Sequence, residues 1–209
     1  MTEKASQSKR KSIVREYAEA ILIALLLALF IRTFVIQAFK IPSGSMLNTL
    51  LIGDHILVNK FIYGIKNPFS GNTWIPVKKP ERGDIVVFKY PINPAQDYIK
   101  RVVGVAGDQI EIKNKKVYVN GELQDESYAI FLDNKILSPG TQSRDNMERI
   151  TVPANSLFVM GDNRDNSYDS RFWKFVELKA VKGKAFIFYW SWDKVNTSVR
   201  WNRIGNLVH

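Results

Sequence analysis

The chain of 209 residues contains no cysteine and only two histidines, His55 and His209. The lack of cysteine excludes disulfides, thiol catalysis and cysteine-ligated zinc. The scarcity of histidine matters because imidazole is the base that most often activates a serine hydroxyl. If a serine of this chain is a nucleophile, a lysine must take its proton, or one of the two histidines must do so. The length allows one domain, or one domain with a small insertion.

Charge is plentiful but unevenly placed. The net charge is +10, and seven of the 30 Lys and Arg residues lie within the first 40 positions. A nucleic-acid-binding module would instead concentrate its basic residues on the folded part of the chain. We therefore expect no nucleic-acid partner.

An apolar segment follows the basic N-terminal residues. Residues 20–31 are all Ala, Ile, Leu or Phe, and apolar residues resume at Phe34 after Arg32 and Thr33. A helix over 20–39 would be about 30 Å long, which matches the hydrocarbon core of a bilayer. Basic residues before it would keep that end in the cytoplasm. We expect a basic cytoplasmic tail at 1–16 and a single transmembrane anchor at 17–38, with the depth of Arg32 left open.

Two alternatives remain for this segment. A cleavable secretion signal has a similar apolar length, but it requires small residues at its cleavage site, and residues 39–42 (FKIP) supply none. A buried core helix fits poorly with the flanking charges. An uncleaved anchor is the interpretation we favour.

Beyond residue 39 the pattern is typical of a mainly β domain. Short β-branched or aromatic runs at 56–58, 85–88, 98–105, 109–113, 116–119, 157–160 and 184–190 alternate with Gly, Pro, Asn and Asp turns. Asn120-Gly121 indicates a tight hairpin turn. The polar segment 113–149 is interpreted as a small β insertion or flap. Residues 39–112 and 150–209 then form an antiparallel β-sheet catalytic domain.

The C-terminal region carries Trp190, Trp192 and Trp201 among several Lys and Arg residues. Aromatic and basic residues together suit a membrane–water interface or nucleic-acid stacking. They also suit an outer strand that covers the core, which is the interpretation we favour.

Ser45 is a candidate nucleophile in the run 41–46 (IPSGSM). Gly44 allows the tight turn that exposes a hydroxyl. In an extended backbone Ser43 lies on the same side as Ser45. The Ser43 hydroxyl and the Ser45 N–H could therefore form an oxyanion hole. Taken alone, this run is more often an ordinary turn.

Lys100 is the candidate base, since it lies in an apolar strand-like run that could bury its amine. A base at that position needs a pKa lowered from about 10.4 towards about 8. Arg101 is expected on the opposite face of the strand, in solvent.

A dense polar loop occupies 161–171 (GDNRDNSYDSR). It does not fit the EF-hand calcium pattern, and its many Asx and Arg residues indicate internal pairing. We expect Asp169 to pair with Arg171 and Ser167 to hydrogen-bond the lysine amine. No metal or other cofactor is expected.

Four segments in this order resemble the bacterial type I signal peptidases, or leader peptidases: 41–50 (IPSGSMLNTL), 82–88 (RGDIVVF), 98–104 (YIKRVVG) and 161–171. The resemblance runs from about residue 39 to 173, and the anchor matches in position. This chain has room for only one N-terminal span, whereas some family members have two.

The resemblance implies a membrane-anchored serine endopeptidase that removes signal peptides from exported preproteins through an acyl-enzyme. Ser45 would be the nucleophile and Lys100 the general base, with Ser43 and Ser45 stabilising the oxyanion. Ser167 would orient the lysine, and Asp169 and Arg171 would support the site. It also implies a single-pass protein of the bacterial cytoplasmic membrane, with the catalytic domain outside and the bilayer as a partner. Shallow pockets for small substrate side chains would be formed by Phe39, Ile41, Pro42, Met46, Leu50, Tyr98 and Ile99.

Three competing hypotheses remain at this stage. His55 could be the base, although the resemblance gives it no role. The chain could be a related Ser/Lys protease that cleaves itself. It could also be a membrane-tethered basic β module that binds anionic lipid or nucleic acid without catalysis. The sequence leaves the oligomeric state unknown.

Overall fold

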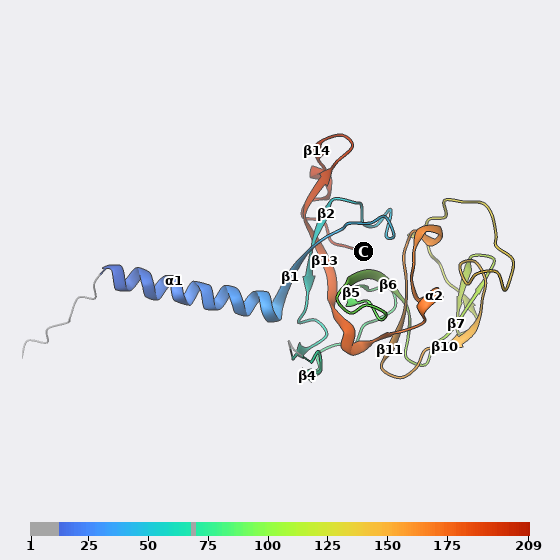
Figure 1. Ribbon diagram of the computed structural model, residues 1–209, viewed down its shortest axis with the longest axis horizontal. Coiled ribbons are helices and arrows are strands. Elements are labelled where there is room, and N and C mark those ends of the chain that lie inside the picture. Colours follow the sequence, from blue (N-terminus) through green and yellow to red (C-terminus); the bar gives the residue numbers. More distant parts are fainter. Residues whose placement is uncertain (1–12, 68–69) are drawn as a thin grey trace, which may run out of the picture.

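The computed structural model describes residues 13–67 and 70–209. One N-terminal helix projects from a body of mainly antiparallel β-structure, as the sequence predicts (Figure 1). Residues 1–12 of the predicted basic tail lie outside the described residues.

Helix α1 (Ile13–Phe30) continues as a π-helical stretch (Ile31–Val35). Within the described ranges, this 23-residue segment is the one helix long and apolar enough to cross a membrane, and none of its apolar window is buried. Leucines such as Leu25 and Leu26 are more than half exposed. The alternative of a buried core helix is therefore wrong.

The helix ends at Val35, and not at Phe39 as the apolar pattern predicted. Strand β1 (Ile36–Lys40) follows at once and pairs antiparallel with β2 (Asp54–Asn59), with Phe39 opposite Ile56. Phe39 packs against the core while its neighbour Lys40 is exposed. The apolar residues at this point serve a sheet because a partner strand, distant in sequence, is available to pair with them.

The main sheet has eight strands in the order β1-β2-β13-β5-β6-β11-β12, with β14 beside β13. All its pairings are antiparallel. Its remaining strands are β5 (Ile85–Lys89), β6 (Asp97–Val105), β11 (Ser156–Met160), β12 (Val176–Glu177), β13 (Val181–Asp193) and β14 (Ser198–Val199). Strand β13 extends past both β2 and β5, so the C-terminal segment joins the two halves of the sheet.

A second sheet of four strands has the order β10-β7-β8-β9 and lies at the far end from α1 (Figure 1). Its strands are β7 (Gln109–Lys113), β8 (Lys116–Val119), β9 (Glu122–Leu123) and β10 (Met147–Thr151). It thus begins before residue 113 and ends after 149. The Asn120-Gly121 hairpin is confirmed, since both residues have positive φ, 54° and 85°.

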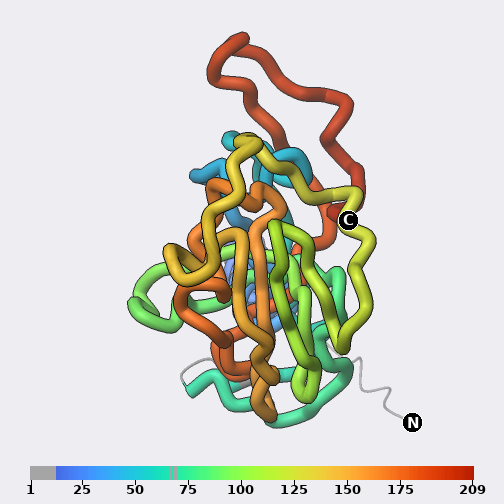
Figure 2. The backbone as a smooth tube through the Cα atoms, turned by 90° about the vertical axis from the view of Figure 1, so that its right-hand side faces the viewer, coloured from blue at the N-terminus to red at the C-terminus, as the bar shows by residue number. Residues whose placement is uncertain are grey.

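The two sheets share a core. Ile110, Val117 and Val119 of the second sheet pack with Phe158 and Met160 of β11, so the insertion is fixed to the main sheet. Figure 2 shows the backbone of this part of the molecule, with β7 and β8 of the second sheet in yellow-green and β11 in orange. A separate hairpin, β3 (Ile65–Lys66) with β4 (Thr73–Ile75), lies near the end of α1 (Figure 1).

The C-terminal tryptophans do not cover the core as we expected. Trp201 is 71% exposed and Trp190 is 37% exposed, and their rings form an edge-to-face pair with centroids 6.2 Å apart. Burial along β13 stops alternating after Ala185, where register shifts interrupt its pairing with β2, and the neighbours Tyr189 and Trp190 are both exposed. Amphipathic patterning alone does not tell which face of so long a strand is covered.

The pairing of β1 with β2 predicts where the chain can be shortened. A fragment that begins at Ile36 keeps β1 and should unfold cooperatively, whereas one that begins at Ile41 loses β1 and the packing of Phe39. We expect a loss of about 3 kcal/mol, or a fall in Tm of about 10 °C. Thermal unfolding followed by circular dichroism measures it, and equal Tm values for the two fragments would contradict the assignment of β1.

Candidate active site

Ser45 and Lys100 lie in contact although they are far apart in the sequence. Ser45 is in the turn region after β1, where the Ile41 N–H donates to Asp54 O, and Lys100 is in β6. The Lys100 Nζ lies 2.7 Å from Ser45 Oγ and 3.0 Å from the Ile99 carbonyl oxygen. The amine therefore has a hydrogen bond to the hydroxyl that it would have to deprotonate.

The Lys100 side chain is only 4% exposed. Burial lowers its pKa to about 8, because an ammonium is poorly solvated in the protein interior. The Asp169 and Asp162 carboxylates oppose this shift, and the Arg171 guanidinium adds to it. A substantial fraction of the amine is thus uncharged in mildly basic solution.

Arg101 is not solvated as we expected. It is 4% exposed, and its Nε and Nη2 donate to the two oxygens of Asp162 at 2.9 and 2.8 Å. The Tyr128 ring of the insertion lies 3.9 Å from its guanidinium carbon. Successive side chains of a strand point to opposite faces, as we expected for Lys100 and Arg101. The face that carries Arg101 is nevertheless covered by the insertion and the polar loop, and solvent does not reach it.

Ion pairs hold the polar loop 161–171 rigid. Asp169 and Arg171 do pair, with Nε–Oδ1 and Nη2–Oδ2 both at 2.8 Å, and both side chains are buried. Asp165 pairs with Lys115 of the insertion at 2.7 Å. Arg164 Nη2 donates to Glu126 of the insertion at 2.7 Å. With Asp162 bound to Arg101, every aspartate of this loop is bound to a basic side chain, which accounts for the density of charge that the sequence shows.

The same loop fixes the backbone of the candidate nucleophile. The Asn163 N–H donates to Ser45 O at 3.1 Å, and the Asn163 side-chain amide donates to Gly44 O at 3.0 Å. A Cβ at Gly161 would lie 2.4 Å from Ser45 O, so only glycine permits this approach. The sequence analysis assigned no role to Asp162 or Asn163, and only the Asx-rich composition of the loop pointed towards them.

Ser167 lies beside this contact but does not make the expected hydrogen bond. Its hydroxyl is buried and has no partner of ordinary geometry among the described residues, although it lies near enough to Asp169 to help lower the pKa of that carboxyl. Its oxygen would be 2.2 Å from a Cβ placed on Gly161. The hydroxyl is thus on the inner side of the loop, close to the backbone of Ser45, the candidate nucleophile.

A groove of about 640 Å³ opens beside the pair. Of the residues that the resemblance placed around the substrate, Ser43, Pro42, Tyr98 and Ile99 line it. Ile41, Met46 and Leu50 are buried in the core behind it, and Phe39 packs against the same cluster. The sequence analysis missed six further lining residues, which come from the turn region after β1, from β6, from the insertion and from the polar loop: Leu47, Asp97, Leu132, Asn163, Asn166 and Tyr168.

Neither histidine, both of which the structure describes, is among the residues that line the groove. The His55 Nδ1 lies 3.2 Å from Gly53 O, and its ring packs edge-on against Tyr189 with centroids 5.8 Å apart. His55 therefore contacts its own turn and β13 in place of the serine.

The Arg101–Asp162 pair predicts a large effect on stability. Asp162→Asn leaves a buried guanidinium without its counter-charge, and we expect the free energy of unfolding to fall by about 3 kcal/mol. Lys182→Met removes the partly exposed Lys182–Asp97 pair and should cost less than about 1 kcal/mol. Urea denaturation of both variants measures this, and losses of the same size would contradict it.

Comparison with known proteins gives consistent results. The family model described as "Signal peptidase, peptidase S26" matches residues 14–190. The signal peptidase I of Pseudomonas aeruginosa is 38% identical over 231 residues, which cover 96% of this chain and 81% of the relative. That of Aquifex aeolicus is 35% identical and covers 87% of this chain and 84% of its own length.

Among solved structures, a crystal structure of a signal peptidase I from Enterococcus faecalis is 34% identical with a TM-score of 0.42. It covers 51% of this chain and 97% of its own. The family assignment does not depend on it, because the family model and the curated relatives each extend over most of the chain. The chain belongs to the signal peptidase family, peptidase S26, and is a serine endopeptidase of the signal peptidase I type.

Proposed function

We propose that this chain is a membrane-anchored endopeptidase that cleaves N-terminal signal peptides from exported preproteins with a Ser45–Lys100 dyad. The observation that carries the proposal is the 2.7 Å contact between a buried amine and the Ser45 hydroxyl. The names of the relatives, signal peptidase I, supply the substrate class.

Covalent catalysis follows from this contact. The uncharged Lys100 amine takes the proton of Ser45 Oγ as that oxygen attacks the carbonyl carbon of the scissile bond. The resulting ammonium gives its proton to the nitrogen of the leaving amine, which leaves an acyl-enzyme on Ser45. Lys100 then takes a proton from a water molecule, which attacks the ester carbon. The C–Oγ bond breaks, the ammonium returns its proton to Ser45 Oγ, and the signal peptide leaves with a new carboxyl group.

Two donors are proposed for the oxyanion. The Ser45 N–H belongs to a segment whose carbonyl groups are bound by Asn163, so its direction is set before the substrate arrives. The Ser43 side chain is exposed at the groove and is free to turn its hydroxyl towards the same point. We assign Ser167 the role of holding the lysine, since its buried hydroxyl has no other partner of ordinary geometry among the described residues.

Substrate selection is proposed to depend on the narrow space beside the dyad. An extended peptide would lie between the segment that bears Ser43 and the first residues of β6, by strand addition. Strand β11 pairs with β6 only from Arg101 onward, which leaves this edge of β6 available near Tyr98. Pro42, Tyr98 and Ile99 wall the groove and Ile41 fills the core behind it, so we expect the substrate side chains nearest the dyad to be small.

The helix is proposed to hold the site at a bilayer surface. The segment Ile13–Val35 would be roughly 35 Å long, enough to cross the hydrocarbon core. Arg32 lies in its last turn and is exposed, so its charge can reach the interface. Ser45 follows Val35 by about ten residues, at most roughly 35 Å of chain.

The proposed location is the bacterial cytoplasmic membrane, with a single span. The basic residues before Ile13 favour a cytoplasmic N-terminus. The dyad then lies on the extracytoplasmic side, where signal peptides emerge.

The dyad is tested by three substitutions in the full chain in detergent, with a preprotein as substrate. Ser45→Ala removes the nucleophile and Lys100→Met the base, and each should lower kcat by about 10³-fold or more. His55→Ala should leave it unchanged, because His55 does not reach the groove. Cleavage assayed on gels measures this, and activity that survives Lys100→Met would rule out the mechanism.

The lowered pKa of Lys100 predicts the pH dependence. Because the uncharged amine is the active form, kcat/KM should rise tenfold per pH unit below about 8 and level off above it. Lys100→Arg should abolish activity throughout. A flat pH–rate profile from pH 6 to 9 would contradict an uncharged lysine base.

The same pKa predicts how stability depends on pH. In the unfolded chain the pKa of this amine is about 10.5, so between pH 8 and 10.5 the unfolded state binds a proton that the folded state has lost. The free energy of unfolding should therefore rise by about 3 kcal/mol over this range, and should not do so in Lys100→Met.

A further inference from the structure

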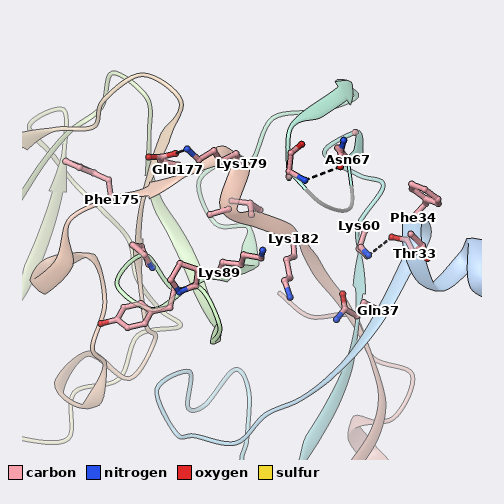
Figure 3. A pocket seen from close by; sticks show the side chains of 18 residues that line it. Thr33, Phe34, Gln37, Lys60, Asn67, Lys89, Phe175, Glu177, Lys179 and Lys182 are labelled. Carbon is pink, nitrogen blue, oxygen red and sulfur yellow. Dashed lines mark hydrogen bonds and ion pairs between the residues drawn. The ribbon is translucent and has the colours of Figure 1, made fainter.

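A second pocket of about 640 Å³ lies between the end of the N-terminal helix and the main sheet. Thr33 and Phe34 of the π-helical stretch form one side, and residues of β5 and β13 form the other. Figure 3 shows Lys89 and Lys182 between the Glu177–Lys179 pair on one side and Lys60 on the other. We call this space the lysine pocket.

Its four lysines are only partly neutralised. Lys182 Nζ lies 2.6 Å from Asp97 Oδ2, and Lys179 pairs with Glu177 at 2.5 Å. Lys60 donates to the carbonyl oxygen of Thr33, which carries no formal charge. Lys89 is exposed and has no ion pair among the described residues. Two positive charges, on Lys60 and Lys89, therefore remain without a carboxylate partner.

The surroundings of Lys60 are short of negative charge. Burial and the nearby Lys182 ammonium both lower the pKa of the Lys60 amine. An anion in the pocket would relieve this repulsion, and two uncompensated ammonium groups match the charge and hydrogen-bonding capacity of a phosphate group.

Apolar side chains extend from the same end of the molecule. The β3–β4 hairpin, whose Ile75 backbone oxygen lies against Gly64 of the pocket wall, exposes Trp74 by 59% and Ile75 by 57%. Phe61, next to Lys60, is 44% exposed. Aromatic side chains beside lysines are typical of the level of lipid headgroups, and here they lie at the end of the proposed span.

We propose that the lysine pocket binds the phosphate headgroup of an anionic phospholipid from the bilayer that α1 crosses. This inference rests on the membrane anchoring proposed above. Lys60 and Lys89 hold the phosphate, while the acyl chains leave the pocket past Phe34 and the helix. A lipid is the favoured occupant over free phosphate because the helix itself supplies a wall of the pocket.

The lysine pocket shares a boundary with the groove of the active site. Asp97 lines the groove and pairs with Lys182 of the pocket. Tyr90 of the pocket stacks on Tyr98 of the groove, with ring centroids 4.3 Å apart. A bound headgroup therefore lies one layer of side chains from the substrate, at the membrane side of the groove.

Native mass spectrometry of the full chain in detergent tests this with phosphatidylglycerol, phosphatidylcholine and inorganic phosphate as probes. The wild type should retain phosphatidylglycerol in preference to phosphatidylcholine. The double variant Lys60→Gln/Lys89→Gln should bind it about thirtyfold more weakly, since each lysine near an anionic lipid contributes about 1 kcal/mol. The matched control Lys113→Gln/Lys116→Gln, with two exposed lysines of the second sheet, should bind as the wild type does.

Three other outcomes would overturn the inference. Equal retention by the lysine-pocket variant and the control would place the lipid elsewhere. Full displacement by inorganic phosphate would show that the occupant is a free anion. A KM for a soluble peptide in lipid-free detergent that rises only in the lysine-pocket variant would show that the pocket binds the substrate. Lipid retention by an enzyme without any peptidase activity would instead contradict the proposed function and leave the pocket's assignment standing. A Tm of the variant equal to that of the wild type controls for folding.

Discussion

The proposed proton transfer from the Ser45 hydroxyl to the Lys100 amine, across their hydrogen bond, requires part of this amine to be uncharged beside two carboxylates. Burial lowers the lysine's pKa, while Asp162 and Asp169 raise it. Each of those aspartates is bound in a two-pronged pair by an arginine, Asp162 by Arg101 and Asp169 by Arg171. Arg171 thus has an electrostatic as well as a structural effect, because its charge lowers the pKa of the Lys100 amine that the nearby carboxylates raise.

The insertion contributes to the same arrangement from outside. Lys115 and Glu126 bind the polar loop, and the Leu132 N–H donates to Asp165. Ile130 forms a bridge with Asn163, the residue that holds the backbone of Ser45. A segment that appears in the sequence as a polar interruption therefore braces the loop that positions the proposed nucleophile, and through Leu132 it also borders the groove.

Part of the fold and of the candidate site was predictable from local sequence patterns. Strands β7 and β8 and the Asn-Gly hairpin follow directly from alternation and turn chemistry. The scarcity of histidine and the four motifs led to Ser45 and Lys100. The end of the helix at Val35, the burial of Arg101 and the exposure of Trp201 were not predictable in this way. Each depends on which distant segment covers a given face, and neither periodicity nor residue type carries that information.

The direct passage from helix to strand at Val35 has a mechanical consequence. No loop separates the two elements, and the Lys60 N–H and side chain clamp the last carbonyl groups of the helix. These contacts restrict rotation of the β-structured body about the end of the helix, so in the proposed membrane-anchored state its height above the lipid would be nearly constant. If α1 spans the bilayer as proposed, such a protease selects by distance as well as by side chains, because only a bond that emerges at the matching level comes within reach.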